Sequence, residues 1–121
     1  MSMIEEIDKA IGAHGKWKGR LRTAIDTKSS DFKPEIVKTD NNCDFGKWLY
    51  GPTISSEIKN TQMYREIVKN HALFHGEAGR ILQLALQGNI EEAEKGLSVG
   101  STFSSLSSNL TKLMMDWKKT F

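Results

Sequence analysis

The sequence predicts an all-α protein, an antiparallel domain that resembles a four-helix bundle with one short extra helix. Apolar residues recur at three- and four-residue steps in three long segments, whereas no segment alternates apolar and polar residues as a half-buried strand does. The two prolines, Pro34 and Pro52, lie outside these segments. At 121 residues the chain is expected to form a single domain, residues 1–121, whose core needs no disulfide.

The first predicted helix covers about residues 2–26. Its buried face is expected to carry Ile4, Ile7, Ile11, His14, Leu21 and Ile25, with Trp17 beside them. Gly12, Gly15 and Gly19 surround His14, and each costs about 1 kcal/mol relative to alanine in a helix interior. We therefore expect another backbone segment to pass close to these glycines, although an intrinsically weak helix would show the same composition.

A long loop and a short helix are expected next. Residues 27–42 are polar around Pro34, and loops of this length are usually functional or flexible. The loop ends in Asp40-Asn41-Asn42, which are good residues to begin a helix. A short helix should then run from about Cys43 to Tyr50, because Gly51-Pro52 is a typical helix end. Cys43 therefore heads the short helix.

Two further helices complete the predicted bundle. One should begin at Ser55 or Ser56 and reach Gln87, after which Gly88-Asn89 forms a tight turn. The last should cover about residues 90–119, with Phe103, Leu106, Leu110, Leu113 and Trp117 on its buried face. Gly96, Gly100 and several serines predict a break near residues 96–101.

The histidines and the cysteine predict a metal site. His71 and His75 are four residues apart, so both imidazoles lie on one face of the long helix, and that face is apolar. His14 lies on the buried face of the first helix. The chain contains three histidines and one cysteine, a donor set that suits tetrahedral Zn²⁺. We therefore predict a zinc site formed by His14, Cys43, His71 and His75.

This donor set argues against an enzyme. Four protein donors leave no open position for a water molecule, which hydrolytic zinc sites retain. The zinc-protease motif requires glutamate directly after its first histidine, and this chain has Ala72 there. Glu66 and Glu77 are expected to be solvated or to accept a hydrogen bond from an imidazole N–H. A metal-dependent hydrolase and a diiron oxygen carrier are thus weaker alternatives, and a buried histidine or cysteine is often purely structural.

Composition narrows the location and the partners. The 17 basic and 15 acidic residues are spread along the chain and give a formal charge of +2, so we expect no nucleic acid partner. A single cysteine suits a reducing cytoplasm. No apolar run is long enough to span a membrane, and no signal peptide is recognisable. The protein is expected to be cytoplasmic, without membrane insertion.

Three motifs resemble the bacterial chemoreceptor zinc-binding domain, or CZB domain. They are His14 followed by Trp17, the Cys-x-x-Gly-x-Trp element formed by Cys43, Gly46 and Trp48, and the His-x-x-x-His pair of His71 and His75. The resemblance extends over about residues 4–118. Their order and separation are much more specific than any one of these motifs alone.

The resemblance implies a helical bundle that binds zinc through three histidines and one cysteine. It also implies a regulatory module, often a homodimer, that is attached to a chemotaxis receptor or a diguanylate cyclase. The receptor or the cyclase then provides the signalling output. In such proteins zinc, or oxidation of the zinc-bound cysteine, alters signalling, and we hypothesise that Cys43 is the movable ligand. A purely structural zinc site in a protein-interaction bundle is the alternative.

Overall fold

The computed structural model describes residues 2–121, and this part of the chain forms helices joined by turns and loops, with no strand. The predicted all-α fold is thereby confirmed. The helices are α1 (Met3–Gly15), α2 (Trp17–Thr27), α3 (Pro34–Val37), α4 (Asp44–Tyr50), α5 (Ser56–Lys59), α6 (Gln62–Leu86), α7 (Ile90–Leu97) and α8 (Thr102–Lys118).

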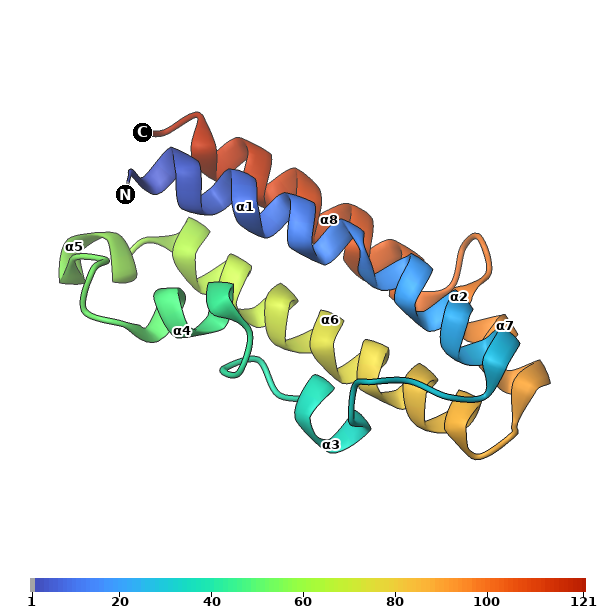
Figure 1. Cartoon of the computed structure of the whole chain (residues 1–121). Helices are drawn as coiled ribbons and strands as arrows, with labels where there is room; N and C mark the ends of the chain where they lie inside the picture. Colours follow the sequence, from blue (N-terminus) through green and yellow to red (C-terminus); the bar gives the residue numbers. More distant parts are fainter. Residues whose placement is uncertain (1) are drawn as a thin grey trace.

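The helices form four legs that run alternately up and down the bundle (Figure 1). The first leg is the pair α1 and α2, the third is α6, and the fourth is α8, which lies beside α1 and runs in the opposite direction. The second leg descends through the short helices α3, α4 and α5 along one side of α6. The second leg therefore has three short helices where the other legs are long rods.

The helix boundaries differ from the predictions at three points, the first of which is α3, a short helix within residues 27–42, where a loop was expected. The single helix expected over residues 2–26 is divided at Lys16, which ends α1 and begins α2 in a helical backbone conformation. The helix expected from Ser55 or Ser56 stops at Lys59, and α6 begins separately because the Thr61 hydroxyl caps it by accepting from the Tyr64 N–H. The break predicted near residues 96–101 is confirmed, since α7 ends at Leu97 and α8 begins at Thr102.

A hydrophobic core extends along the whole bundle, and the histidines lie within it. Its largest fully buried apolar side chains are Ile7, Leu21, Leu49, Ile67, Phe74, Ile81, Leu82, Leu110, Met114 and Trp117. His14, His71 and His75 are 6%, 0% and 2% exposed. Because an imidazole loses hydration when it is buried, three of them together require partners for their ring nitrogens.

The glycines near His14 do not have the role that was predicted. A Cβ atom at Gly12, Gly15 or Gly19 would meet nothing within 4 Å, so no other backbone passes close to them and the prediction is wrong. Close approaches occur instead at Gly46, where a Cβ would lie 1.7 Å from the Asp40 carbonyl oxygen, and at Gly79, where it would lie 2.9 Å from the Lys38 nitrogen. Gly46 therefore lies within the second leg, and Gly79 lies on α6 where the second leg packs against it.

Within residues 2–121, no helix is both long enough and apolar enough to cross a membrane.

Candidate metal centre

The four predicted donors converge on one point in the middle of the bundle. His14 comes from the end of α1, Cys43 directly precedes α4, and His71 and His75 lie one turn apart on α6. Their ligand atoms all lie within 4.8 Å of one another. The Nε2 atom of His14 is 3.0 Å from Nε2 of His71 and 3.2 Å from Nε2 of His75, and Cys43 Sγ is 3.4 Å from His71 Nε2.

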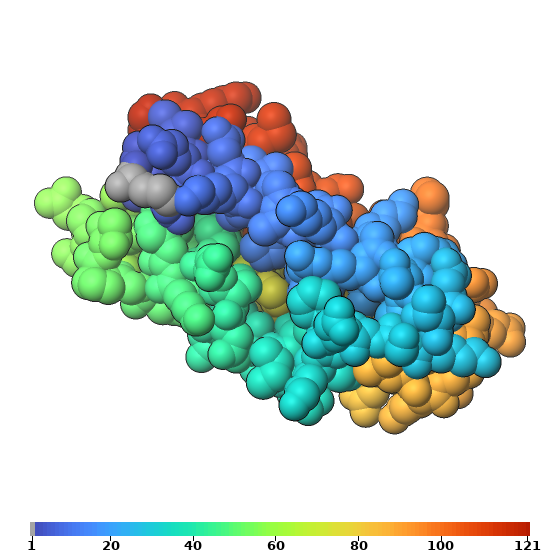
Figure 2. All heavy atoms as spheres, viewed as in Figure 1, coloured from blue at the N-terminus to red at the C-terminus, as the bar shows by residue number. Residues whose placement is uncertain are grey.

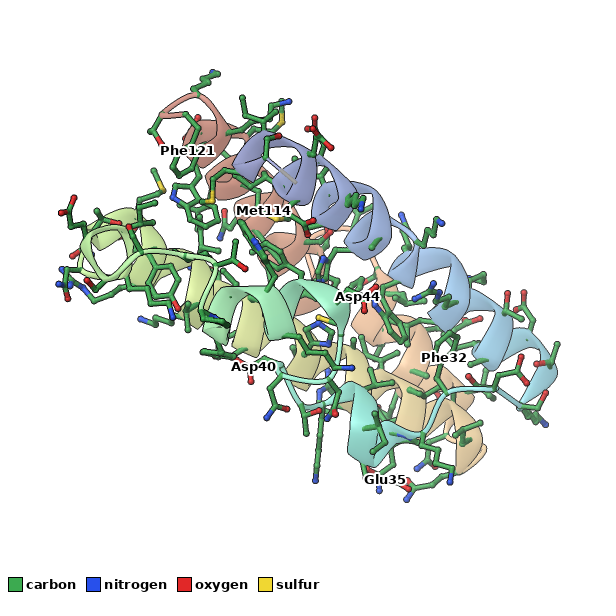
Figure 3. The ribbon with its side chains drawn as sticks, turned by 60° about the vertical axis from the view of Figure 1, so that its left-hand side comes forward. Phe32, Glu35, Asp40, Asp44, Met114 and Phe121 are labelled. Atoms are coloured by element: carbon green, nitrogen blue, oxygen red, sulfur yellow. The ribbon has the colours of Figure 1, made fainter. Side chains whose placement is uncertain are left out.

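Cys43 is held in place by the first turn of α4. It is the N-cap residue, and its Sγ accepts a hydrogen bond from the Gly46 N–H at 3.3 Å. Gly46 also makes room for the Asp40 carbonyl oxygen, which any side chain there would strike. Figure 3 shows the chain that carries Phe32, Glu35 and Asp40 leading into the start of α4 at Asp44. The preceding loop and α4 together fix the thiol opposite α6.

Backbone carbonyl groups set the orientation of two imidazoles. His14 Nδ1 lies 2.8 Å from the Ala10 oxygen, and His75 Nδ1 lies 2.9 Å from the Val37 oxygen. A carbonyl oxygen only accepts hydrogen bonds, so in both neutral rings Nδ1 carries the proton and Nε2 presents a lone pair. Both lone pairs are directed to the centre of the cluster. This is the arrangement that metal-binding histidines use.

The third imidazole lacks such a partner. His71 is fully buried, and its Nδ1 atom is the buried side-chain nitrogen or oxygen within residues 2–121 for which no hydrogen-bond partner is found. Its Nε2 atom faces the other donors at the distances given above. His71 is therefore directed to the centre by packing between neighbouring rings, including Phe45 at 5.1 Å between ring centroids.

Burial keeps the histidines neutral. The pKa of His14 is lowered to about 4, mainly because burial removes hydration; the Ala10 carbonyl opposes this shift, and the neighbouring His75 and Arg20 add to it. The pKa values of His71 and His75 are lowered as well, again mainly by burial. Burial raises the pKa of the Cys43 thiol, although the Gly46 N–H opposes this. The cluster thus presents neutral imidazoles and a protonated thiol at neutral pH.

These residues fit a zinc ion. Bonds of about 2.0–2.1 Å to nitrogen and about 2.3 Å to sulfur place the corners of a tetrahedron about 3.3 to 3.6 Å apart. Three of the six donor separations, 3.0, 3.2 and 3.4 Å, are close to these lengths, and all four ligand atoms lie within 4.8 Å of one another. Two Nε2 lone pairs that face each other at 3.2 Å repel unless a cation lies between them. Donor types, spacing and orientation all suit Zn²⁺.

The acidic residues weighed as possible members of the site lie elsewhere. Glu66 is exposed and accepts a hydrogen bond from Gln62, and Glu77 forms an ion pair with Arg80. Instead of these carboxylates, the Ala10 and Val37 carbonyl groups accept hydrogen bonds from Nδ1 of His14 and His75. Sequence reasoning missed these two acceptors, because every residue has a carbonyl group and no residue type marks the two that are used.

A cavity of about 620 Å³ connects the cluster to the surface. His14, Cys43 and His75 lie in its wall together with Trp17, which is buried, and Phe32, which is exposed. Figure 2 shows a hollow between the first leg and the chain around α3 and α4, with yellow atoms of α6 at its base. Three of the four donors therefore line this cavity.

A comparison with protein families found one relationship. The family model described as the chemoreceptor zinc-binding domain matches residues 14–82. No curated protein and no solved structure matches the sequence. The matched range covers more than half of the 121 residues and contains all four converging side chains.

Proposed function

The chain belongs to the chemoreceptor zinc-binding domain family, and from this we propose that it is a sensory or regulatory module that holds one zinc ion on His14, Cys43, His71 and His75. The observation that carries the proposal is the convergence of these four donors, the only histidines and cysteine in the chain. The proposal treats residues 1–121 as a single domain.

The residues of the cluster prepare the site to different extents. His14 and His75 already present Nε2 lone pairs, because their Nδ1 protons are bonded to the Ala10 and Val37 carbonyls. Cys43 must release its proton to bind, and the Gly46 N–H then stabilises the thiolate. Bound zinc supplies positive charge that offsets the mutual repulsion of the donors. Zinc binding should therefore join α1, α4 and α6.

Cys43 is the proposed movable ligand of a switch. Its side chain is half-buried, it lies in the wall of the cavity, and it follows a long connecting segment. A peroxide or hypochlorite that takes two electrons from the thiolate would convert it to a sulfenic acid, a weaker ligand. Loss of this ligand would release α4 and the segment before it from α6. The switch would then report zinc or an oxidant.

The signalling context is proposed from the family. We propose a cytoplasmic homodimer that regulates a chemotaxis receptor or a diguanylate cyclase and has no catalytic activity of its own. The four protein donors support this, since a closed tetrahedral shell has no position for a reactive water. Trp117 is 2% exposed and packs on Trp48 inside the domain, so it is not available for a contact between subunits.

Metal analysis tests the site. Wild-type protein purified without added metal should contain about one zinc per chain by mass spectrometry. Cys43→Ser should contain less zinc but not none, because three histidine donors remain. Leu73→Ala is a suitable control, since Leu73 lies on α6 between the two histidines but is 48% exposed. Wild-type protein without zinc but with intact helices would contradict the proposal.

Chelation separates the sensor from a purely structural site. The apolar core continues at both ends of the bundle, from Trp117 to Leu82, well beyond the four donors. A sensor should therefore keep most of its helical circular dichroism after zinc is removed, and it should regain zinc on titration. Complete unfolding on chelation would favour the structural alternative.

A further inference from the structure

The segment Pro34–Asn42, here called the strap, lies against α6 and leads directly to Cys43. Its first part is α3, and hydrogen bonds from the N–H groups of Val37 and Lys38 to Lys33 and Pro34 hold this turn together at 2.9 and 3.0 Å. Val37 is buried, whereas Lys38 and Glu35 are exposed. The strap therefore has one face on the bundle and one in solvent.

The strap fits onto α6 at a glycine. A Cβ atom on Gly79 would lie 2.9 Å from the Lys38 nitrogen and from its Cα, which is closer than real Cβ atoms approach a neighbour. The obstacle is backbone, so it cannot rotate aside as a flexible side chain does. Gly79 follows His75 by one helical turn and lies on the same face. The contact thus lies directly beside the metal centre.

This contact brings a strap carbonyl to a zinc donor. Val37, the residue before Lys38, accepts the Nδ1 proton of His75 at 2.9 Å. That hydrogen bond fixes both the ring orientation and the nitrogen that carries the lone pair. If the strap left Gly79, His75 would lose the partner that prepares it for metal.

The other end of the strap is attached to α4. The Asp40 carbonyl oxygen occupies the space that a side chain at Gly46 would fill, and the Asp40 carboxylate accepts a hydrogen bond from the Tyr50 hydroxyl. Gly46 in turn donates its N–H to Cys43 Sγ. The strap therefore contacts the surroundings of one donor at each end, His75 at α6 and Cys43 at α4.

We propose that docking of the strap on Gly79 and zinc binding are one coupled equilibrium, so that the strap is the element of the fold that responds to metal. This inference rests on the proposed zinc site. Zinc that binds His75 and Cys43 favours the docked strap, and by reciprocity any change that loosens the strap weakens zinc binding. The exposed face of the strap would then differ between the zinc-bound and zinc-free protein.

Hydrogen exchange of the wild-type protein tests the coupling directly. Amides of residues 35–43 should exchange faster after zinc is removed with a chelator, because the strap leaves α6. Amides in the middle of α6 and α8 should change much less, because the core there does not depend on the metal. Equal protection of residues 35–43 with and without zinc would overturn the proposal.

Two alanine substitutions on α6 provide a matched pair. Gly79→Ala obstructs the Lys38 backbone, whereas a Cβ at Gly76 meets nothing within 4 Å. We expect Gly79→Ala to weaken zinc binding about tenfold to a hundredfold, the range found when the hydrogen-bond partner of a metal ligand is lost. Gly76→Ala should bind zinc as the wild type does. Affinities are measured by competition with a chelator, with circular dichroism to confirm the helices.

A milder variant covers the case in which Gly79→Ala fails to fold. Tyr50→Phe removes only the hydroxyl that bonds Asp40, and Tyr50 is 47% exposed, so the core is untouched. It should weaken zinc binding about twofold to tenfold, as loss of one exposed hydrogen bond does, and should speed exchange in the strap.

The outcomes separate the two proposals. Zinc affinity of a folded Gly79→Ala that equals the wild-type value, or of Tyr50→Phe that does so where Gly79→Ala does not fold, would overturn the coupling and leave the zinc site intact. Absence of zinc binding in the wild type would instead overturn the proposed function.

Discussion

At the scale of single residues, the three histidines are prepared for metal to different extents. His14 and His75 each donate Nδ1–H to a carbonyl group, whereas Nδ1 of the fully buried His71 has no partner. A buried polar atom without a partner destabilises a fold, and the cost is tolerated where function requires the group. His71 is therefore the residue whose removal should affect stability and zinc binding in opposite directions.

The first prediction concerns this residue. His71→Leu should raise the free energy of unfolding of the metal-free protein by about 1 to 3 kcal/mol, because an apolar side chain of similar size leaves no unsatisfied nitrogen. The same change should weaken zinc binding. His71→Asn is the control, since it keeps a buried polar group and should not be stabilised. Urea unfolding with a chelator present measures the free energy of unfolding of both variants. Equal destabilisation of His71→Leu and His71→Asn would contradict the prediction.

The sequence predicted which side chains converge but not what surrounds them. His14, Cys43, His71 and His75 could be found because histidine and cysteine are rare in this chain and fall at helical positions. That they are the zinc ligands is still a proposal. The Val37 carbonyl could not be found, because its role depends on how a loop folds across α6. Of the two expectations for Glu66 and Glu77, a hydrogen bond from an imidazole is wrong, since Glu66 is exposed and accepts from Gln62, and Glu77 pairs with Arg80.

At the scale of elements, glycines within helices differ in their surroundings: some face open space, and others are crowded by a neighbouring helix. Gly12 lies in an open part of α1, whereas a Cβ at Gly96 in α7 would lie 2.7 Å from Ile81 Cγ1 on α6. The sequence could not separate these cases, since only the neighbouring helix shows which glycine is crowded. It could predict the break between α7 and α8 because two glycines and a capping serine mark it. Pro34, at the first position of α3, is a similar signal for the start of a helix.

The second prediction uses this contrast. Gly12→Ala should raise the free energy of unfolding by about 0.5 to 1 kcal/mol, since alanine favours a helix and nothing obstructs it. Gly96→Ala gains the same helix propensity but must displace Ile81, so it should lose about 1 to 3 kcal/mol in net stability. Chemical unfolding of both variants measures the difference. A stabilised Gly96→Ala would show that α7 packs less tightly on α6 than described.

At the scale of the whole molecule, the buried histidines make the metal-free fold sensitive to acid. Burial lowers the pKa of His14 to about 4 and lowers the pKa values of His71 and His75, whereas an unfolded histidine has a pKa near about 6.5. Below that value the unfolded chain binds protons that the folded chain excludes. Stability is therefore complete above about pH 6.5 and is lost as the pH falls toward about 4.

The third prediction gives the size of this effect. His14 should contribute a loss of up to about 1.4 kcal/mol per pH unit between pH 6.5 and pH 4, and His71 and His75 should add losses of the same sign. Denaturant titrations of chelator-treated protein at several pH values measure the slope. His71→Leu removes one such group, so its slope should be shallower by about the contribution of one histidine. Stability that is constant from pH 7 to pH 5 would contradict the burial of neutral imidazoles.

The up-down arrangement brings the first and last described residues to the same end of the bundle (Figure 1). Lys118 and Asp8, which form an ion pair at 2.9 Å, join the first and fourth legs close to that end. A short linker could therefore join the first and last described residues, and the four legs could still pack together if the chain began at another turn. A circular permutant that links residues 121 and 2 and opens at the turn Gly88-Asn89 would keep all four donors in place, and the same geometry allows the domain to be inserted into a surface loop of another protein.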